Sequence, residues 1–315
     1  YSLIKKMNNW FYLSLVAPIV WTIVNHFDKY LLSRVFKNNG TGALFIFSGL
    51  FSIFVTISII LFFDSSVLSL PLRDILILLV TGSLNGFAFY LYLYVLNTEE
   101  TSIVVPLLQL TPVFTYLLGY IVLGEVLTSQ QLIASLIVLC GVLLISIDLD
   151  IDNKVGIKHS ALGLVALASL LFALHDVLFK FIAVKDSFIN STFWQYLGVT
   201  CVAVCTFIFS KKYRDQFLQM VRLNNFKIIS LNISSEILYI TGNLFSNFAT
   251  LFAPVVLVSV VGSYQPLFVF TVGILLTVFL PKIADEKITI RHLLQKLVSI
   301  IIIIIGTYLL YSSSV

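Results

Sequence analysis

A row of polar side chains interrupts an apolar segment around residue 236, and these residue types could bind a solute or a proton. Asn232, Glu236, Tyr239, Asn243 and Ser246 follow one another at spacings of 4, 3, 4 and 3 residues. This spacing places all five on one side of a helix. If the helix crosses a membrane, an acid facing lipid at its centre would cost about 2.5–3.5 kcal/mol, so the polar side should face protein or water. The pattern predicts that Glu236 borders an interior cavity.

Glu236 has two interpretations. In the functional one it binds a cationic or zwitterionic substrate, or a proton that competes with the substrate, because a desolvated carboxyl group is stabilised by either. In the structural one it is a neutral packing residue, hydrogen-bonded to Tyr239 or to a residue of the next helix. The sequence leaves both open.

Two proline-containing segments hold a second set of polar residues. Gln109, Pro112 and Tyr116 lie at i, i+3 and i+7. Their counterparts in a similar later segment are Ser263, Pro266 and Phe270. A proline inside a helix frees a carbonyl and bends the helix, which membrane proteins tolerate where neighbours or cavity water satisfy the exposed group. The two bends either surround a binding site or serve only the shape of the bundle.

Charged residues also lie near the ends of two other apolar segments. They are Asp28 and Lys29 in the first segment, and Asp176 and Lys180 in the sixth. Lysine stems can reach the membrane interface, and an acid can pair with a lysine there, so these four residues are predicted to have a structural or gating role. The nearby histidines lack the spacing of metal ligands, so neither a metal nor another cofactor is predicted.

The composition places these residues in a membrane protein. Of 315 residues, 59% are hydrophobic and 11% charged, and the mean hydropathy is +1.04, whereas soluble domains have about 25% charged residues. About 20 apolar residues span a bilayer. Ten segments approach this length, at 9–33, 42–63, 73–96, 101–123, 129–147, 160–184, 190–209, 227–248, 252–280 and 292–312.

Several classes of function are excluded or disfavoured. The net charge of +4 is not gathered into a basic patch, so no nucleic-acid partner is predicted. The sequence has no Ser-His-Asp order and no phosphate-binding glycine loop, so an enzyme is not expected. Cys140, Cys201 and Cys205 all lie in apolar segments, and we expect buried free thiols.

The two halves of the chain resemble each other. The polar segment 148–160 separates five apolar segments from five, which predicts units at 1–150 and 151–315. Asn25-x3-Lys29 and Asp176-x3-Lys180 are equivalent, and so are Glu125-Val-Leu-Thr128 and Glu286-Lys-Ile-Thr289. An odd number of helices per repeat makes the second copy enter the membrane from the opposite side, which gives an inverted pair.

The stretch SIVVPLLQLTPVFTYLLGYIVLGEVLTSQQLIASLIVLCGVLLIS at 102–146 resembles the helix 4–5 signature of the drug/metabolite transporter superfamily, in its EamA-type branch. NHFDKYLLSR at 25–34 and ALHDVLFKFIA at 173–183 resemble helices 1 and 6 of that family. The resemblance implies two inverted five-helix repeats around a cavity walled by helices 3, 4, 8 and 9. The second Leu-Gly-Glu is replaced by FLPKIADE at 279–286, which departs from the family pattern.

We therefore predict an all-α membrane protein with ten transmembrane helices. Its predicted function is secondary transport of a small organic solute such as an amino acid or amine, as exporter or importer, by alternating access with protons as a candidate coupling ion. A lipid-modifying membrane enzyme and a non-transporting receptor or scaffold remain alternatives. Asn85 joins the predicted site because an offset of 154 residues matches it to Tyr239. The predicted substrate-binding residues are Asn85, Gln109, Tyr116, Glu236, Tyr239, Asn243, Ser263, Tyr264 and Gln265.

The basic residues give a topology that conflicts with the resemblance. Of nineteen Lys and Arg residues, four lie on the side of the amino terminus and thirteen on the opposite side, with Lys29 and Lys180 inside helices. The positive-inside rule then places both termini outside. The resemblance implies cytoplasmic termini, and a location in the cytoplasmic membrane of a bacterium.

Overall fold

The computed structural model describes residues 9–36, 40–63, 67, 69–99, 104–105, 107–146, 159–222, 226–279 and 290–312, and within them every regular element is helical. The first half contains α2 (Asn9–Tyr30), η1 (Leu31–Val35), α3 (Thr41–Phe51), α4 (Ile53–Phe62), α5 (Leu72–Thr98), η3 (Leu108–Leu110), α7 (Thr111–Leu118), η4 (Gly119–Leu123) and α8 (Ser129–Ser146). The second half contains α9 (His159–Ala183), α10 (Phe188–Phe209), α11 (Lys211–Arg222), α12 (Phe226–Ala249), α13 (Val255–Gly262), α14 (Gln265–Phe279) and α15 (Ile290–Ser312).

Six helical stretches of the described chain are long and apolar enough to cross a membrane. They are Asn9–Val35, Thr41–Phe62, Leu72–Thr98, Leu162–Ala183, Phe188–Phe209 and Val255–Gly273. The helix α12 is as long as these but is absent from the set, because polar residues interrupt its apolar character. The chain is therefore an integral, multi-pass membrane protein.

The ten predicted ranges coincide with helical segments, but the count of ten separate helices is not confirmed. Three ranges are divided: 42–63 near Ser52, 101–123 into η3, α7 and η4, and 252–280 between α13 and α14. Proline explains two divisions, because α7 has Pro112 in its first turn and α14 has Pro266 in its own. The sequence interpretation also missed α11, which is too polar to resemble a membrane span.

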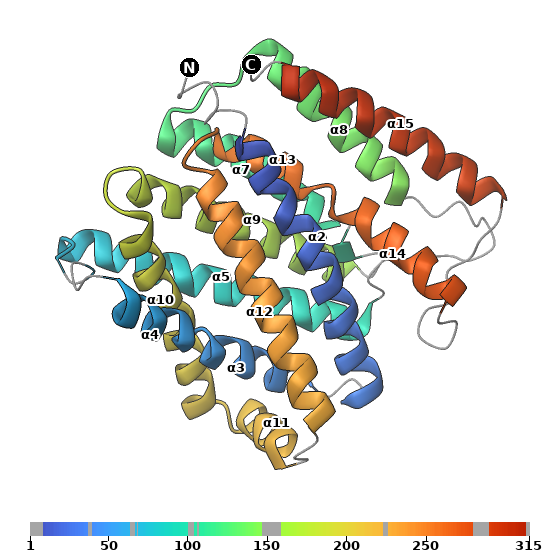
Figure 1. Ribbon diagram of the computed structural model, residues 1–315. Helices are drawn as coiled ribbons and strands as arrows, with labels where there is room; N and C mark the ends of the chain where they lie inside the picture. Colours follow the sequence, from blue (N-terminus) through green and yellow to red (C-terminus); the bar gives the residue numbers. More distant parts are fainter. Residues whose placement is uncertain are drawn as a thin grey trace.

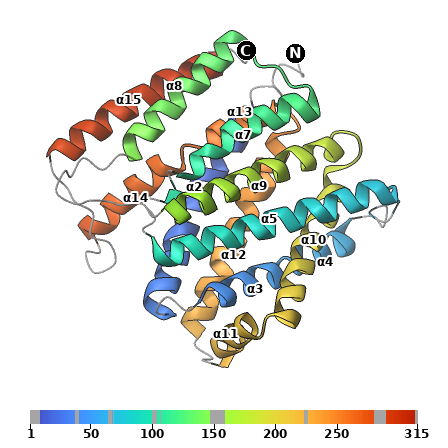
Figure 2. The same cartoon turned by 180° about the vertical axis from the view of Figure 1, so that it is seen from behind.

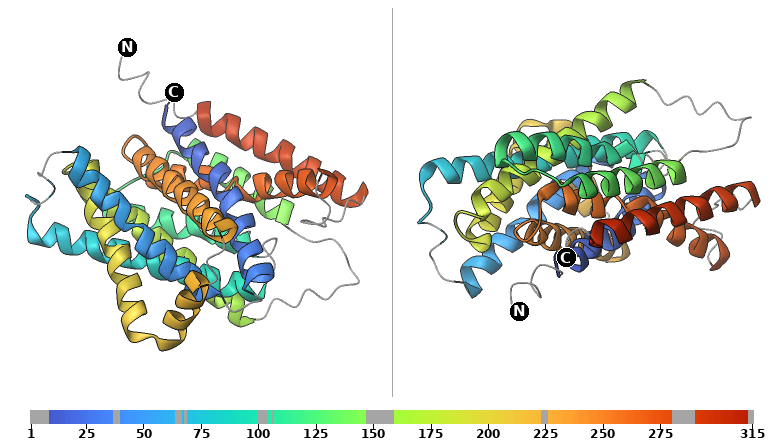
Figure 3. Two further views of the ribbon diagram at one scale, coloured as in Figure 1. Left: turned by 60° about the horizontal axis from the view of Figure 1, so that its bottom comes forward. Right: turned by 90° about the horizontal axis from the view of Figure 1, so that it is seen from above.

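Long helices pack in pairs that join the two halves of the sequence. The helices α2 and α12 lie side by side (Figure 1), and so do α5 and α9 (Figure 2). The helices α8 and α15 form a third pair at the edge of the bundle, also seen from above (Figure 3). Gly141 and Gly306 permit this last contact, because a Cβ at either would lie within 3.0 Å of the partner helix.

The closest approach at any described glycine joins α5 to α10. A Cβ on Gly82 would lie 1.9 Å from the carbonyl oxygen of Gln195, and one on Gly198 would lie 2.3 Å from that of Leu79. Each glycine thus lets its helix rest directly on the backbone of the other.

Two apolar clusters make the core. One joins α2, α8, α13 and α15, and the other joins η1, α3 and α5 with part of α9. Phe89 and Tyr92 belong to the second cluster and Val258 to the first, and all three also line the same cavity. The cavity therefore lies between the two clusters.

The expectation of buried cysteines is wrong. Cys140, Cys201 and Cys205 are free, as expected, but exposed on the outer surfaces of their helices. A membrane bundle places apolar residues outward as readily as inward, because lipid tails are as apolar as a protein core. Apolar neighbours along the sequence therefore do not indicate burial within the protein.

Candidate functional site

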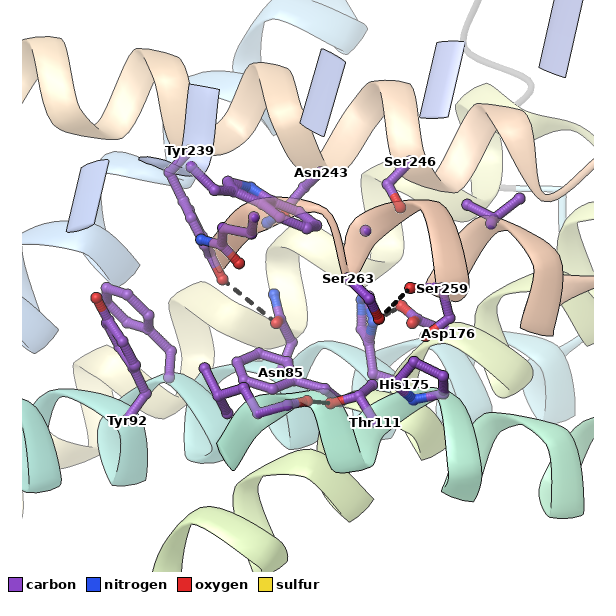
Figure 4. A pocket seen from close by; sticks show the side chains of 18 of the residues that line it. Asn85, Tyr92, Thr111, His175, Asp176, Tyr239, Asn243, Ser246, Ser259 and Ser263 are labelled. Atoms are coloured by element: carbon purple, nitrogen blue, oxygen red, sulfur yellow. Dashed lines mark hydrogen bonds and ion pairs between the residues drawn. The ribbon is translucent and has the colours of Figure 1, made fainter. Parts of the chain in front are cut away.

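A cavity of about 140 Å³ lies in the middle of the bundle, between α2, α5, α7, α9, α12 and α13. Figure 4 shows Asn85, Tyr239 and Asp176 among the side chains that converge on it from different helices. The Tyr239 hydroxyl donates to Asn85 Oδ1 at 3.4 Å across the cavity, from α12 to α5. The Ser263 hydroxyl donates to the Ser259 carbonyl at 3.2 Å.

The lining residues come in pairs at nearly constant sequence separation. Residues from α2 and α9 pair at 151 positions: Trp21 with Phe172, Val24 with His175, and Asn25 with Asp176. Residues from α5 and α12 pair at 154 positions: Asn85 with Tyr239, Phe89 with Asn243, and Tyr92 with Ser246. The same 154 positions separate Leu108 from Gly262, Gln109 from Ser263, and Thr111 from Gln265.

The cavity includes six of the nine predicted substrate-binding residues. These are Asn85, Gln109, Tyr239, Asn243, Ser263 and Gln265. Their positions agree with the predicted site, and their role in binding stays a prediction.

Three predicted residues do not line the cavity. Tyr116 and Tyr264 belong to the apolar cluster of α2, α8, α13 and α15, and the Tyr264 hydroxyl is hydrogen-bonded to Thr307. Both have large ring surfaces that pack between helices, and a residue's place in the sequence does not separate this use from a cavity wall.

Glu236 borders α3 rather than the cavity, which corrects the expectation for this residue. It is 7% exposed and accepts a hydrogen bond from Ser48 Oγ at 2.7 Å. The polar side of α12 is long, and it passes from α3 at Glu236 to the cavity at Tyr239. Glu236 is therefore buried within protein, as the cost of an acid in lipid requires.

A second buried acid lies beside Glu236. Ser235, its neighbour on α12, donates to Asp28 Oδ1 at 3.2 Å, which joins α12 to α2. Asp28 is 4% exposed, and its Oδ2 has no hydrogen-bond partner in the described part of the chain.

The two predicted gating lysines tie helix ends together. The Lys29 ammonium donates to the carbonyl oxygens of Leu96 and Glu99 at 2.9 and 2.8 Å. The Lys180 ammonium donates to the carbonyl oxygen of Ala253 at 2.6 Å. It also pairs with Glu125 at 2.5 Å.

Glu125 extends this contact to α13. Its Oε2 accepts a hydrogen bond at 2.8 Å from the backbone N–H of Val255, the first residue of that helix. A carboxylate at a helix amino terminus is favoured by the helix dipole.

Of the two prolines predicted to bend helices, Pro112 lines the cavity and Pro266 does not.

A polar chain leads from the cavity into the protein on α9. His175 Nδ1 lies 3.0 Å from Asp176 Oδ1, and His175 Nε2 lies 2.6 Å from Gln195 Nε2. The amide of Asn247 donates to Gln195 Oε1 at 3.1 Å. Among the described residues, no three His, Cys, Asp or Glu side chains gather closely enough to hold a metal ion.

Sequence reasoning missed most of the aromatic wall. Trp21, Phe89 and Phe172 were not predicted, and Tyr92 was not selected although it is 5% exposed and donates to Asn25 Oδ1 at 2.8 Å. Aromatic residues in apolar segments also serve as interfacial anchors, so their type alone does not identify a cavity. The constant separation of 151 or 154 positions is the signal that could have found them.

A bundle of membrane-spanning helices around a small, partly polar central cavity defines a multi-pass membrane protein, and small-molecule sites commonly have such a cavity. Residues 8–147 match the EamA-like transporter family, and the resemblance is confirmed over this part of the chain. The family comprises membrane transporters of small solutes rather than enzymes.

Comparison with solved structures supports the fold of the whole chain. Among 25 matching chains, one described as "Crystal structure of protein" is similar with a TM-score of 0.59 and 16% identity, over 91% of this chain and 95% of its own. At this identity the likeness concerns the fold alone. No curated protein matches the sequence at comparable significance.

Proposed function

We propose that the chain is a secondary transporter of a small organic solute, which works by alternating access between two inverted five-helix repeats, 1–150 and 151–315. The observation that supports this most is the paired lining of the cavity. Nine pairs at separations of 151 or 154 positions are expected if the cavity lies on a pseudo-two-fold axis that relates the two halves.

The helix packing and the lysine contacts agree with the same symmetry. The pair α5 with α9 is equivalent to the pair α12 with α2. Lys29 and Lys180 are 151 positions apart, and the carbonyls that they bind, those of Glu99 and Ala253, are 154 positions apart. Two similar halves provide inward-open and outward-open states of comparable energy.

The proposed symmetry relates two helix interfaces, which we call seams: α5 with α10, and α12 with α3. They differ in the way that alternating access requires. Gly82 rests on the backbone of Gln195 between α5 and α10. In the proposed repeat, Gly82 is equivalent to Glu236, 154 residues later, and Gln195 is equivalent to Ser48, 147 residues earlier. Glu236 on α12 and Ser48 on α3 meet through one side-chain hydrogen bond. We interpret the first seam as closed and the second as the one that closes in the opposite state.

Coupling to protons is assigned to the acids beside the second seam. Asp28 and Glu236 are buried in α2 and α12, and they accept hydrogen bonds from the hydroxyl groups of Ser235 and Ser48 respectively. A proton would neutralise either acid without a counter-ion from the protein. We further propose the cytoplasmic membrane of a bacterium as the location, as the resemblance to EamA-type transporters implies.

Solute flux in proteoliposomes tests the function. Purified protein would be assayed by counterflow against a panel of amino acids, amines, nucleosides and sugars. Asn85→Trp, which fills the cavity, should abolish flux of the transported solute, whereas Tyr94→Phe at an exposed position of the same helix should not. Absence of flux for every solute from folded protein would refute transport, and covalent change of a lipid would favour the enzyme alternative.

A further inference from the structure

Acidic charge enters the cavity at one place. Asp176 is the only acidic residue among the described residues that line it, and no lysine or arginine lines it. The nearest lysine on the same helix, Lys180, already binds Glu125 and the Ala253 carbonyl. A quarter of the Asp176 side chain is exposed, and it faces the cavity.

The hydrogen bonds around His175 leave that charge uncompensated. Gln195 Oε1 accepts from Asn247, so the Gln195 amide nitrogen faces His175 Nε2 and donates to it. The imidazole then has its hydrogen on Nδ1, where it donates to Asp176 Oδ1. Both imidazole nitrogens are occupied in this arrangement, and a single hydrogen bond from Nδ1 reaches Asp176.

Five aromatic residues form part of the remaining wall, together with neutral amide and hydroxyl side chains. Trp21, Phe89, Tyr92, Phe172 and Tyr239 line it. Ring faces attract cations, most strongly where water is excluded. A volume of about 140 Å³ is close to the roughly 150 Å³ of an engineered cavity that takes up benzene, so a ligand of about six non-hydrogen atoms fits.

We propose that this cavity binds a small monovalent organic cation, with its ammonium group beside Asp176 and its hydrocarbon body against the aromatic rings. The proposal rests on the proposed transport function and names its substrate class. A cation brings the counter-charge that Asp176 lacks at membrane depth, whereas a neutral or anionic solute leaves the carboxylate unpaired.

Thermal unfolding of the purified full chain in detergent tests the proposal, because a ligand that binds the folded state raises the melting temperature. The probes are tetramethylammonium and propylammonium, with propanol, tert-butanol and propionate as uncharged or anionic matches and sodium chloride at equal ionic strength. We expect a saturable rise in Tm with the two cations alone. In Asp176→Asn the apparent Kd should weaken at least about tenfold, as expected when a buried charge loses its partner.

Asp74→Asn, which removes an acid outside the cavity, is the matched control and should keep the cation effect. Equal shifts with propanol and propylammonium in the unmodified protein would overturn the proposal, even if Asp176→Asn does not fold. Retention of the cation effect in a folded Asp176→Asn variant would also overturn it. Cation binding without flux would refute transport alone, and flux of a neutral solute without cation binding would refute the substrate class alone.

Discussion

Replacing Gly82 with alanine perturbs a contact in which α5 rests on the backbone of α10. The added Cβ would lie 1.9 Å from the Gln195 carbonyl oxygen, whereas ordinary contacts begin at 3.4 Å, so α5 and α10 must separate locally by about 1.5 Å. The obstructing atom belongs to the backbone, and no side-chain rotation can remove it. Overpacking costs about 1–3 kcal/mol, and we expect the upper end here.

Gly86→Ala is the matched control, because Gly86 lies one turn further along α5 and its Cβ would meet Val202 at 3.8 Å, an ordinary contact. Both variants would be unfolded thermally in the same detergent at one scan rate. With an unfolding entropy of about 2.1 cal/mol/K per residue, about 3 kcal/mol corresponds to roughly 4–5 °C in a chain of 315 residues. We expect a fall of that order for Gly82→Ala and little change for Gly86→Ala.

Equal melting temperatures for the two variants would refute the close contact between α5 and α10. Counterflow is a second readout, since alanine at position 82 prevents the seam from closing and should slow exchange even in protein that folds. Normal exchange by Gly82→Ala would contradict the assignment of this seam as one that closes during transport.

Three further predictions concern charged groups. Glu125→Gln and Lys180→Met should each lower the free energy of unfolding by about 2–4 kcal/mol, because each leaves its partner charge unpaired. In a double-mutant cycle measured by denaturant unfolding, the double variant should lose less than the sum of the two, with a coupling energy of about 1–3 kcal/mol. Strict additivity would contradict the ion pair. Glu236→Gln should fold and keep an acceptor for its hydrogen bond, but change the pH profile of counterflow, and an identical profile would remove this residue from proton coupling. A double variant, Asn25→Asp with Asp176→Asn, moves the negative charge to the equivalent position across the proposed axis. It should recover at least half of the cation-dependent stabilisation of the unmodified protein. A double variant that is stabilised no more than Asp176→Asn alone would argue against the symmetry.

The apolar length of the segments was enough to locate the helical ranges, because a bilayer requires about 20 such residues whatever their neighbours are. It could not locate α11, because charged and amide side chains make up most of this helix, in which Gln216 and Met220 are buried. Gln216 binds the backbone N–H of Gly42 at 2.9 Å, a tertiary contact that the local sequence does not encode.

The polar side of α12 faces protein, as predicted, but only its part from Tyr239 onward lines the cavity, whereas Glu236 contacts α3. Helical spacing fixes the direction of a side chain about its own helix, while the neighbour at each level depends on how the helices cross. Glu236 and Tyr239 differ by less than one turn, yet one meets Ser48 on α3 and the other Asn85 on α5. The sequence therefore identified a polar surface, and packing divided it into a seam and a cavity wall.

The paired positions of the cavity differ in chemistry, and this difference has a consequence for the proposed cycle. Asn25 stands opposite Asp176 and Val24 opposite His175, so the acidic charge comes from α9 alone. If the two halves exchange conformations, the backbone contributions to the two states are nearly equal, and the energy difference between them depends on the residues that break the symmetry. In the proposed cycle a bound cation would stay beside Asp176 in both states, so it need not leave its counter-charge while the helices move around it.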